Sequence, residues 1–183
     1  MKDGHGRTID YLRISLTDRC NYRCIYCMPE EGVQSMCHTD ILRIEEIAHV
    51  VRVFSNLGIK SVRLTGGEPL VRKGVVDLVR DINDMPGIKN ISLTTNGVLL
   101  NDEVMEFCNR EMDNVVLSVD GRKEVHDRMR PFPKGAGSYD LVIPKFQKFA
   151  ESRHQDKYYV RGTFTRYNLD FAKDVLSLAD LGF

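Results

Sequence analysis

Short runs rich in β-branched and aromatic residues alternate along the chain with longer runs whose apolar residues recur at helical spacing. The β-rich runs, which we expect to be strands, cover residues 11–17, 61–64, 90–94, 115–119 and 158–164. The helical runs cover residues 45–57, 75–82, 102 to about 109 and 138–152, with a last one that begins at Asn168 or Asp170 and is closed by Gly182. Asp102 and Ser138 are the expected N-caps of two helices, and Pro144 predicts a kink or a later start in the second.

Five strand–helix units follow one another without hairpin turns, which predicts an α/β fold with a parallel sheet of right-handed βαβ units. A closed or partly closed barrel and an open doubly wound sheet both fit this alternation. In either architecture the site is expected at the carboxyl ends of the strands. Four motifs follow strands in this way, namely "DRCNYRCIYCMPE", "GGEP", "TTNG" and "SVDGR".

The composition narrows the class of protein. The chain has 183 residues, about one domain, and its 26 Lys and Arg balance its 26 Asp and Glu, so its net charge favours neither a nucleic-acid nor a membrane partner. Its apolar runs are too short to span a membrane, and its polar start is not a secretory signal. Cys37 and Cys108 complete no recognisable disulfide framework, which predicts a cytoplasmic protein with reduced thiols, and Cys108 is expected in the core.

Three cysteines, Cys20, Cys24 and Cys27, lie in one short segment with the spacing C-x-x-x-C-x-x-C. A closed zinc site needs four ligands, so zinc would require another ligand such as Cys37 or His38. A [4Fe–4S] cluster held by three thiolates instead leaves one iron open to a non-protein ligand, which suits chemistry better than simple electron transfer. Spacing alone leaves both alternatives open.

With Tyr26 before the last cysteine, this segment resembles the signature of the radical S-adenosylmethionine (SAM) superfamily. The resemblance implies a partial (β/α) barrel, with about five βα units present of the usual six, and a [4Fe–4S] cluster ligated by Cys20, Cys24 and Cys27. It also implies that SAM chelates the open iron and is cleaved reductively to a 5'-deoxyadenosyl radical. The expected electron source is a reductant protein such as flavodoxin or ferredoxin.

The other strand-end motifs match SAM-binding positions of that superfamily. The motif "GGEP" supplies Gly66, Gly67 and Glu68, whose backbone and carboxylate are expected to meet the SAM ammonium group. Glycines permit close approach of a ligand, and a carboxylate complements an amine. The residues that lie where the superfamily contacts the SAM carboxylate and ribose are Thr94, Asn96 and Ser118. Taken singly, all of these also fit a Gly-rich turn or polar strand ends without a ligand, but their order at successive strand ends favours SAM.

Residues 6–101 resemble the GTP 3',8-cyclase family, lyases that catalyse the first step of molybdenum-cofactor biosynthesis. The match is carried by "YLRISLTDRCNYRCIYCMPEEG", "VRLTGGEPLVRKG" and "ISLTTNGVLL". It implies GTP as the substrate, with Arg13 and Arg63 facing it, although Ser61 stands where a basic residue is common. As strand residues, Arg13 and Arg63 would equally fit a barrel lining made of ion pairs.

Residues 101–183 resemble a different branch, the radical SAM maturases that form thioether crosslinks in small Cys-rich peptides. The segments "SVDGRKEVHDRMRPFPKGAGSYD" and "YYVRGTFTRYNLDFAKDVLSLADLGF" carry this likeness, which makes such a peptide the alternative substrate. A natural recombinant, an engineered chimera or a mis-assembled gene would each place a junction near residue 101. Here Arg161 is expected either to reach the SAM carboxylate or to form an ion pair. His126, in "HDRMRP", fits an acid–base residue, but the more common case, a histidine exposed on a loop, is expected.

Relative to these families, residues 1–183 are expected to form a truncated core domain without a sixth strand and without a C-terminal Cys-rich region for auxiliary clusters. An open strand edge predicts self-association. The same feature leaves a third alternative, a fragment that holds a cluster or metal without turnover.

Overall fold

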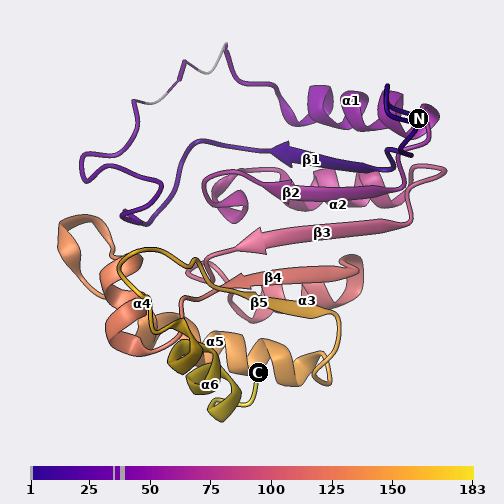
Figure 1. The fold of residues 1–183 in the computed structure, drawn as a ribbon. Coiled ribbons are helices and arrows are strands. Elements are labelled where there is room, and N and C mark those ends of the chain that lie inside the picture. Colours follow the sequence, from indigo (N-terminus) through magenta and orange to yellow (C-terminus); the bar gives the residue numbers. More distant parts are fainter. Residues whose placement is uncertain (1, 35, 38–39) are drawn as a thin grey trace.

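A computed structural model describes residues 2–34, 36–37 and 40–183. Successive strands of the chain are neighbours in one five-stranded parallel sheet (Figure 1). The strands are β1 Tyr11–Ser15, β2 Ser61–Thr65, β3 Asn90–Thr95, β4 Asn114–Ser118 and β5 Tyr158–Arg161. A doubly wound sheet reverses its strand order at a switch point, whereas this sheet runs β1 to β5 without reversal. The partial barrel of five βα units is therefore confirmed, and the doubly wound alternative is wrong.

Helices connect the strands and follow the pattern expected from the sequence, with one addition. Their bounds are α1 Ile44–Asn56, α2 Val75–Asn83, α3 Asp102–Glu111, α4 Lys123–Met129, α5 Tyr139–Ser152 and α6 Phe171–Asp180, with 3-10 turns η2 Pro69–Val71 and η3 Pro133–Gly135. The unpredicted helix is α4, which spans two turns with three buried residues and has too little apolar periodicity to be recognised. No helix of the described residues is long and apolar enough to cross a membrane.

Several predicted boundaries and caps are wrong in detail. Strands β1 and β5 end at Ser15 and Arg161, two and three residues earlier than expected, because the chain leaves the sheet there to form the loops of the carboxyl edge. The N-cap of α3 is Asn101 rather than Asp102, since the Asn101 side chain accepts a hydrogen bond from the Val104 N–H at 2.9 Å.

Helix α5 begins before Pro144. It includes Pro144 and starts at Tyr139, so the alternative of a later start is wrong. Ser138 occupies the N-cap position, as expected, but its side chain makes no capping hydrogen bond. The cap comes from Asp127 instead, whose Oδ1 accepts hydrogen bonds from the N–H groups of Ser138 and Tyr139 at 2.7 and 2.8 Å. Asp170 takes the N-cap position of α6, and Gly182 follows that helix with φ of +88°.

The two faces of the sheet differ in polarity. Residues at alternate strand positions, such as Val62, Leu64, Leu93 and Leu117, are buried in one apolar core with residues of α1, α2, α3 and α5. The opposite, open face carries the intervening residues, which are mostly polar. The strands end on one side of the molecule, where the segment that carries the three cysteines extends beyond the arrowheads (Figure 1).

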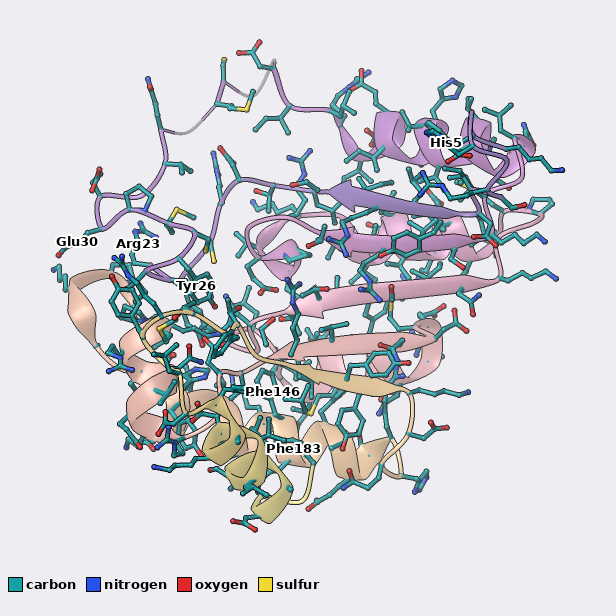
Figure 2. The ribbon with its side chains drawn as sticks, viewed as in Figure 1. His5, Arg23, Tyr26, Glu30, Phe146 and Phe183 are labelled. Carbon is teal, nitrogen blue, oxygen red and sulfur yellow. The ribbon has the colours of Figure 1, made fainter. Side chains whose placement is uncertain are left out.

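The core against α5 depends on Phe146, which is fully buried (Figure 2). A Cβ atom placed on Gly97 would lie only 2.3 Å from Phe146 Cε1, so the ring packs directly against the turn that follows β3. We expect Phe146→Ala to lower the free energy of unfolding by about 3–5 kcal/mol, through lost apolar contact and the cavity left behind. Urea unfolding measures this loss. Leu176→Ala, at a 64% exposed position of α6, is the control and should change stability by less than about 0.5 kcal/mol. Equal losses in the two variants would contradict the packing described here.

Candidate functional site

The three cysteines lie on the loop that follows β1. The N–H groups of Cys27 and Met28 both donate to the Cys24 carbonyl, at 3.0 and 2.9 Å, which makes a tight turn between the second and third cysteines. The thiols of Cys24 and Cys27 are hydrogen-bonded to each other. Cys24 is buried, Cys20 is half-buried and Cys27 is exposed. One loop therefore presents three sulfur atoms at the carboxyl edge of the sheet.

Two N–H donors point at the sulfur of Cys20. The Tyr22 backbone N–H lies 3.5 Å from Cys20 Sγ, and the Asn96 side-chain amide lies 3.7 Å from it. The same amide donates to Asn21 Oδ1 at 2.6 Å, and the Tyr22 hydroxyl donates to the Asn96 carbonyl at 3.3 Å. Hydrogen bonds to sulfur stabilise a thiolate and tune the potential of iron–sulfur clusters. Asn96 thus joins the "TTNG" motif to the cysteine loop.

The three thiols differ in acidity. The hydrogen bond with Cys24 lowers the pKa of Cys27 to about 7. The same hydrogen bond, together with burial, raises the pKa of Cys24, and burial raises the pKa of Cys20. Cys27 is therefore the thiol of the loop that ionises first as the pH rises.

Gly66 and Gly67 allow the "GGEP" segment to lie against the chain that leads into the cysteine loop. The N–H groups of Gly67 and Glu68 donate to the carbonyls of Thr17 and Arg19, at 2.7 and 2.9 Å. A Cβ atom on Gly67 would lie 2.2 Å from the Arg19 carbonyl oxygen. The close approach that these glycines permit is thus made by the protein's own backbone.

Glu68 lies beneath this edge of the sheet and links two motifs. It is 1% exposed, its Oε1 accepts from the Thr95 hydroxyl at 2.9 Å, and its Oε2 accepts from the Asn96 N–H at 2.7 Å. Burial raises the pKa of Glu68 to about 7. A direct contact between the Glu68 carboxylate and the SAM ammonium group stays a prediction. The hydrogen bond from Thr95, a residue that sequence reasoning missed beside Thr94, connects the "GGEP" motif to the strand end that carries "TTNG".

The strands carry arginine side chains on the open face of the sheet but no acidic residues. The parallel register pairs Arg13 directly with Arg63, and continues through Ser92 and Asn114 to the next strands. Arg63 donates to Ser92 Oγ at 3.2 Å, and Arg161 is exposed at the register position of Ser118. No Asp or Glu lies in any of the five strands. A face of this charge favours an anionic ligand.

The ion pairs found among the described residues include none of Arg13, Arg63 and Arg161. The alternative that these arginines line the barrel in ion pairs is therefore wrong. Thr94 and Ser118 share the open face, since the register pairs Thr94 with Val116 and Ser118 lies two residues further along β4. Neither makes a hydrogen bond to the cysteine loop in the described structure, so their contact with SAM stays a prediction.

The zinc alternative gains no support. Among the described residues, no group of three or more His, Cys, Asp or Glu side chains is arranged to hold a single metal ion. His38 lies outside the described residues, and Cys37 is exposed. A four-iron cluster differs from a single ion because it takes each thiolate at a separate corner. The donor set of three thiols with N–H groups directed at sulfur fits such a cluster.

A segment that sequence reasoning left out of the site holds the cysteine loop from the other side. The Arg23 N–H donates to the Pro131 carbonyl at 2.8 Å, and the Ile25 N–H donates to the Met129 carbonyl at 3.1 Å. The rings of Tyr22 and Phe132 pack edge to face, with centroids 5.2 Å apart. The motif "HDRMRP" was visible in the sequence, but nothing in it indicated a contact with residues a hundred positions earlier.

The expectation that His126 is exposed on a loop is wrong. His126 lies within α4 and is fully buried, with its Nε2 3.1 Å from Ser138 Oγ and the Asp120 N–H 3.3 Å from its Nδ1. Burial lowers the pKa of His126 to about 4, so the ring is neutral near pH 7 and serves the core. Cys108 is also fully buried, which confirms its predicted place in the core.

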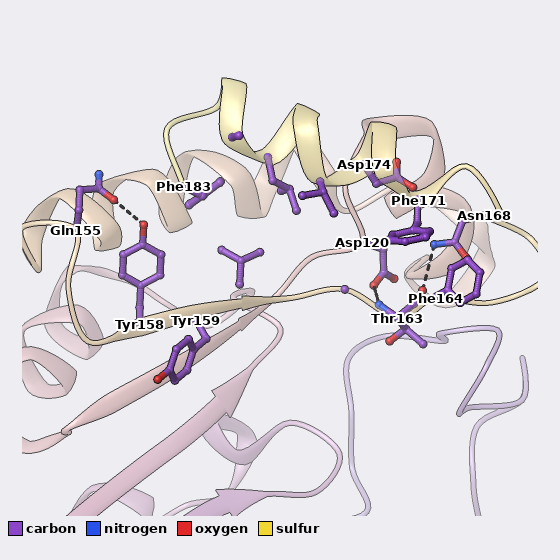
Figure 3. A pocket seen from close by; sticks show the side chains of 15 residues that line it. Asp120, Gln155, Tyr158, Tyr159, Thr163, Phe164, Asn168, Phe171, Asp174 and Phe183 are labelled. Carbon is purple, nitrogen blue, oxygen red and sulfur yellow. Dashed lines mark hydrogen bonds between the residues drawn. The ribbon is translucent and has the colours of Figure 1, made fainter.

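A separate cavity of about 510 Å³ lies between β5 and α6 (Figure 3). Its lining is largely apolar and includes Val160, Phe171 and Leu178, with Asp120 and Thr163 at one end. Tyr158 points toward the helices while Tyr159 points away from them (Figure 3). The cavity is therefore on the helix side of the sheet, opposite the face that carries Arg13 and Arg63.

Comparison with known proteins matches this chain to a family. A model of the Radical SAM superfamily matches residues 14–152. GTP 3',8-cyclase of Clostridium perfringens (strain 13 / Type A) is 43% identical over 179 residues, which are 98% of this chain and 54% of that protein. GTP 3',8-cyclase of Pelotomaculum thermopropionicum is 55% identical over 145 residues, 78% of this chain and 44% of that protein. The chain spans about half the length of these curated relatives, and the first match runs across residue 101.

Solved structures share the fold. Native anSMEcpe with bound AdoMet has a TM-score of 0.77 and 22% identity, covering 94% of this chain and 49% of that chain. Streptococcus suis SuiB bound to precursor peptide SuiA has a TM-score of 0.72 and 19% identity, covering 94% of this chain and 36% of that chain. At these identities the likeness concerns the fold.

The raised pKa of Glu68 predicts a pH dependence of stability. Because this pKa is about 7 in the folded chain against an ordinary value of 4.5, the native state binds more protons than the unfolded state between these pH values. The free energy of unfolding therefore falls as the pH rises through this interval. The stability of the wild type relative to Glu68→Gln should fall by about 3 kcal/mol from pH 4.5 to above 7. Urea unfolding of the metal-free chain, with thiols kept reduced, measures it.

Glu106→Gln, at an exposed position of α3, is the matched control. Its stability should run parallel to that of the wild type over the same pH range. A Glu68→Gln variant that also runs parallel to the wild type would show that folding does not raise the pKa of the Glu68 carboxyl group.

Proposed function

The chain belongs to the radical SAM superfamily, and we propose that it binds a [4Fe–4S] cluster through Cys20, Cys24 and Cys27 and cleaves SAM reductively. The observation that carries the proposal is the loop of three thiols, with N–H groups of Tyr22 and Asn96 directed at Cys20. When bound, the cluster and SAM would supply the one-electron chemistry that yields a 5'-deoxyadenosyl radical. A reductant protein such as flavodoxin or ferredoxin would supply the electron, in a cytoplasm that keeps the thiols reduced.

The chain's own residues position these groups. The three cysteines would ligate three irons and leave the fourth for SAM, and Tyr26, which directly precedes Cys27, would border the cluster. Backbone groups of Gly66 and Gly67, with Glu68 beneath them, shape the place for the SAM ammonium group. The SAM carboxylate and ribose are assigned to Thr94, Asn96 and Ser118. Of these, Asn96 has structural support, since it already contacts Cys20 and Asn21.

We propose GTP as the substrate and GTP 3',8-cyclisation, the lyase reaction that begins molybdenum-cofactor biosynthesis, as the parent activity. Two features support it, the curated relatives that bear this name and the open face on which Arg13 lies beside Arg63. A triphosphate is polyanionic, and guanidinium groups bind phosphate oxygens in bidentate fashion. The activity belongs to proteins about twice as long, so the chain would contribute the SAM half of the site and part of the GTP half.

The alternative is maturation of a ribosomally made, Cys-rich peptide by thioether crosslinking. It is favoured by the likeness of "SVDGRKEVHDRMRP" and the segments after it to such maturases, and the SuiB structure of the same fold holds a precursor peptide. A fragment that holds the cluster without turnover is the remaining alternative. Self-association at the β5 edge stays a prediction.

Anaerobic reconstitution tests the cluster. The wild type should bind about four iron and four sulfide per chain, with an EPR signal that SAM alters. Cys20→Ala, Cys24→Ala and Cys27→Ala should each lose most of this iron. Cys37→Ala is the control, because Cys37 enters only the zinc alternative, and it should keep the full iron content. Zinc in place of iron, or loss of metal in Cys37→Ala, would contradict the proposal.

Substrate choice is tested by the release of 5'-deoxyadenosine from the reconstituted chain with GTP or with a Cys-rich peptide. GTP should stimulate release. Arg13→Ala and Arg63→Ala should each weaken GTP binding by about tenfold or more, because a hydrogen bond to a charged group contributes about 1.5–3 kcal/mol. Arg52→Ala, at an exposed position of α1, is the control and should bind GTP like the wild type. Stimulation by the peptide and not by GTP would favour the maturase alternative.

A further inference from the structure

A buried ion pair lies next to the cysteine loop, and neither of its two residues has been given a role above. Arg130 binds Asp120 in bidentate fashion, with Nε 2.8 Å from Oδ2 and the terminal nitrogen 3.0 Å from Oδ1. Their side chains are 9% and 0% exposed. Two charges taken out of water carry a desolvation cost, so such a pair is weak evidence for stability and invites a question about its use.

The pair contacts Tyr26, the residue before the third cysteine. The Tyr26 hydroxyl donates to Asp120 Oδ2 at 3.3 Å, and the Arg130 guanidinium lies over the Tyr26 ring, 5.4 Å from its centroid. Tyr26 lies at the end of the molecule where the cysteine loop is found (Figure 2). The Tyr26 side chain is thus held both at its hydroxyl and on the face of its ring. Because Tyr26 directly precedes Cys27, these contacts restrain the backbone that leads into Cys27.

The backbone on either side of Arg130 holds the other part of the loop. The carbonyls of Met129 and Pro131 accept hydrogen bonds from Ile25 and Arg23, the two residues that flank Cys24. One segment of three residues therefore fixes Cys24 through the main chain and approaches Cys27 through the Arg130 side chain.

Asp120 has no capacity left for a ligand. Besides two bonds from Arg130 and one from Tyr26, its Oδ1 accepts from the Thr163 N–H at 2.7 Å (Figure 3). These four donors fill the acceptor positions of a carboxylate. Asp120 and Arg130 are consequently suited to hold other groups in place, and the Thr163 contact ties the end of β5 to the same point.

We propose that Asp120 and Arg130 are positioning residues that hold Cys24 and Cys27 in the geometry that binds the cluster. This inference rests on the cluster-binding function proposed above. Partners that orient metal ligands in this way affect both the retention of the metal and its electronic properties.

The first test uses the metal-free chain, so that it does not depend on the cluster. Amide hydrogen exchange of Arg23 and Ile25 should be faster in Arg130→Gln than in the wild type, and intermediate in Arg130→Lys, which keeps the charge but not the bidentate fork. Arg153→Gln is the matched control. Arg153 is also buried, but it binds carbonyls of Cys108, Met112 and Lys157, so its loss should leave exchange in the cysteine loop unchanged.

The second test uses the reconstituted protein and an iron chelator. Iron should leave Arg130→Gln about 10- to 100-fold faster than the wild type, with a shifted EPR signal of the reduced cluster, while Arg153→Gln keeps the wild-type rate and signal. Tyr26→Phe removes the hydroxyl and keeps the ring, and it should release iron about two- to tenfold faster. If Arg130→Gln does not fold, the Tyr26→Phe variant tests the proposal in its place.

The positioning role would be overturned if folded Arg130→Gln showed the exchange, iron release and EPR signal of the wild type. If Arg130→Gln does not fold, the role would be overturned by wild-type iron release and EPR signal in Tyr26→Phe. A wild-type chain that takes up no iron would instead defeat the cluster proposal, and the exchange measurements would then still show whether this pair holds the loop.

Discussion

Parallel pairing between successive strands brings five carboxyl ends to one edge of the sheet, where backbone N–H and C=O groups need partners beyond the sheet ladder. At this edge the loops satisfy one another. Gly67 and Glu68 donate to Thr17 and Arg19, and the carbonyls of Met129 and Pro131, at the end of α4, accept from the residues that flank Cys24. The cysteine loop has almost no regular secondary structure of its own, so its shape depends on these bonds from other strand ends. A change in strand order would separate the groups that make them.

Charge is distributed unevenly across the same structure. Glu68 and Asp120 are buried and hydrogen-bonded, while Arg13, Arg63 and Arg161 stand on the open face without acidic partners among the described residues. Buried carboxylates act here as acceptors for backbone and side-chain donors of neighbouring loops. Arg13 and Arg161 are exposed, and Arg63 is half-buried with a hydrogen bond to Ser92. This division separates the residues that hold neighbouring loops together from those that stand on the open face.

The alternation of side chains along a strand explains which residues of a motif do which task. In "TTNG", Thr94 points to the open face while Thr95 points inward and binds Glu68. In β2 and β1, the same alternation puts Arg63 and Arg13 on the open face and Leu64 and Ile14 toward the helices. A motif read as a string gives neighbouring residues equal weight, whereas the pleat assigns them to different sides of the sheet.

The sequence by itself determined the five strand–helix units, the three cysteines and the motifs at the strand ends, because hydrophobic period and short-range spacing are local properties of a chain. It also placed Cys108 in the core. It did not determine the strand order, the burial of His126 or the partner of Glu68, which depend on packing between distant segments. The contact between the cysteine loop and residues 129–131, and the pair of Asp120 with Arg130 that borders it, were decided only by the tertiary structure. No periodicity or spacing connects residues a hundred positions apart, since folding alone brings their hydrogen-bonding groups together.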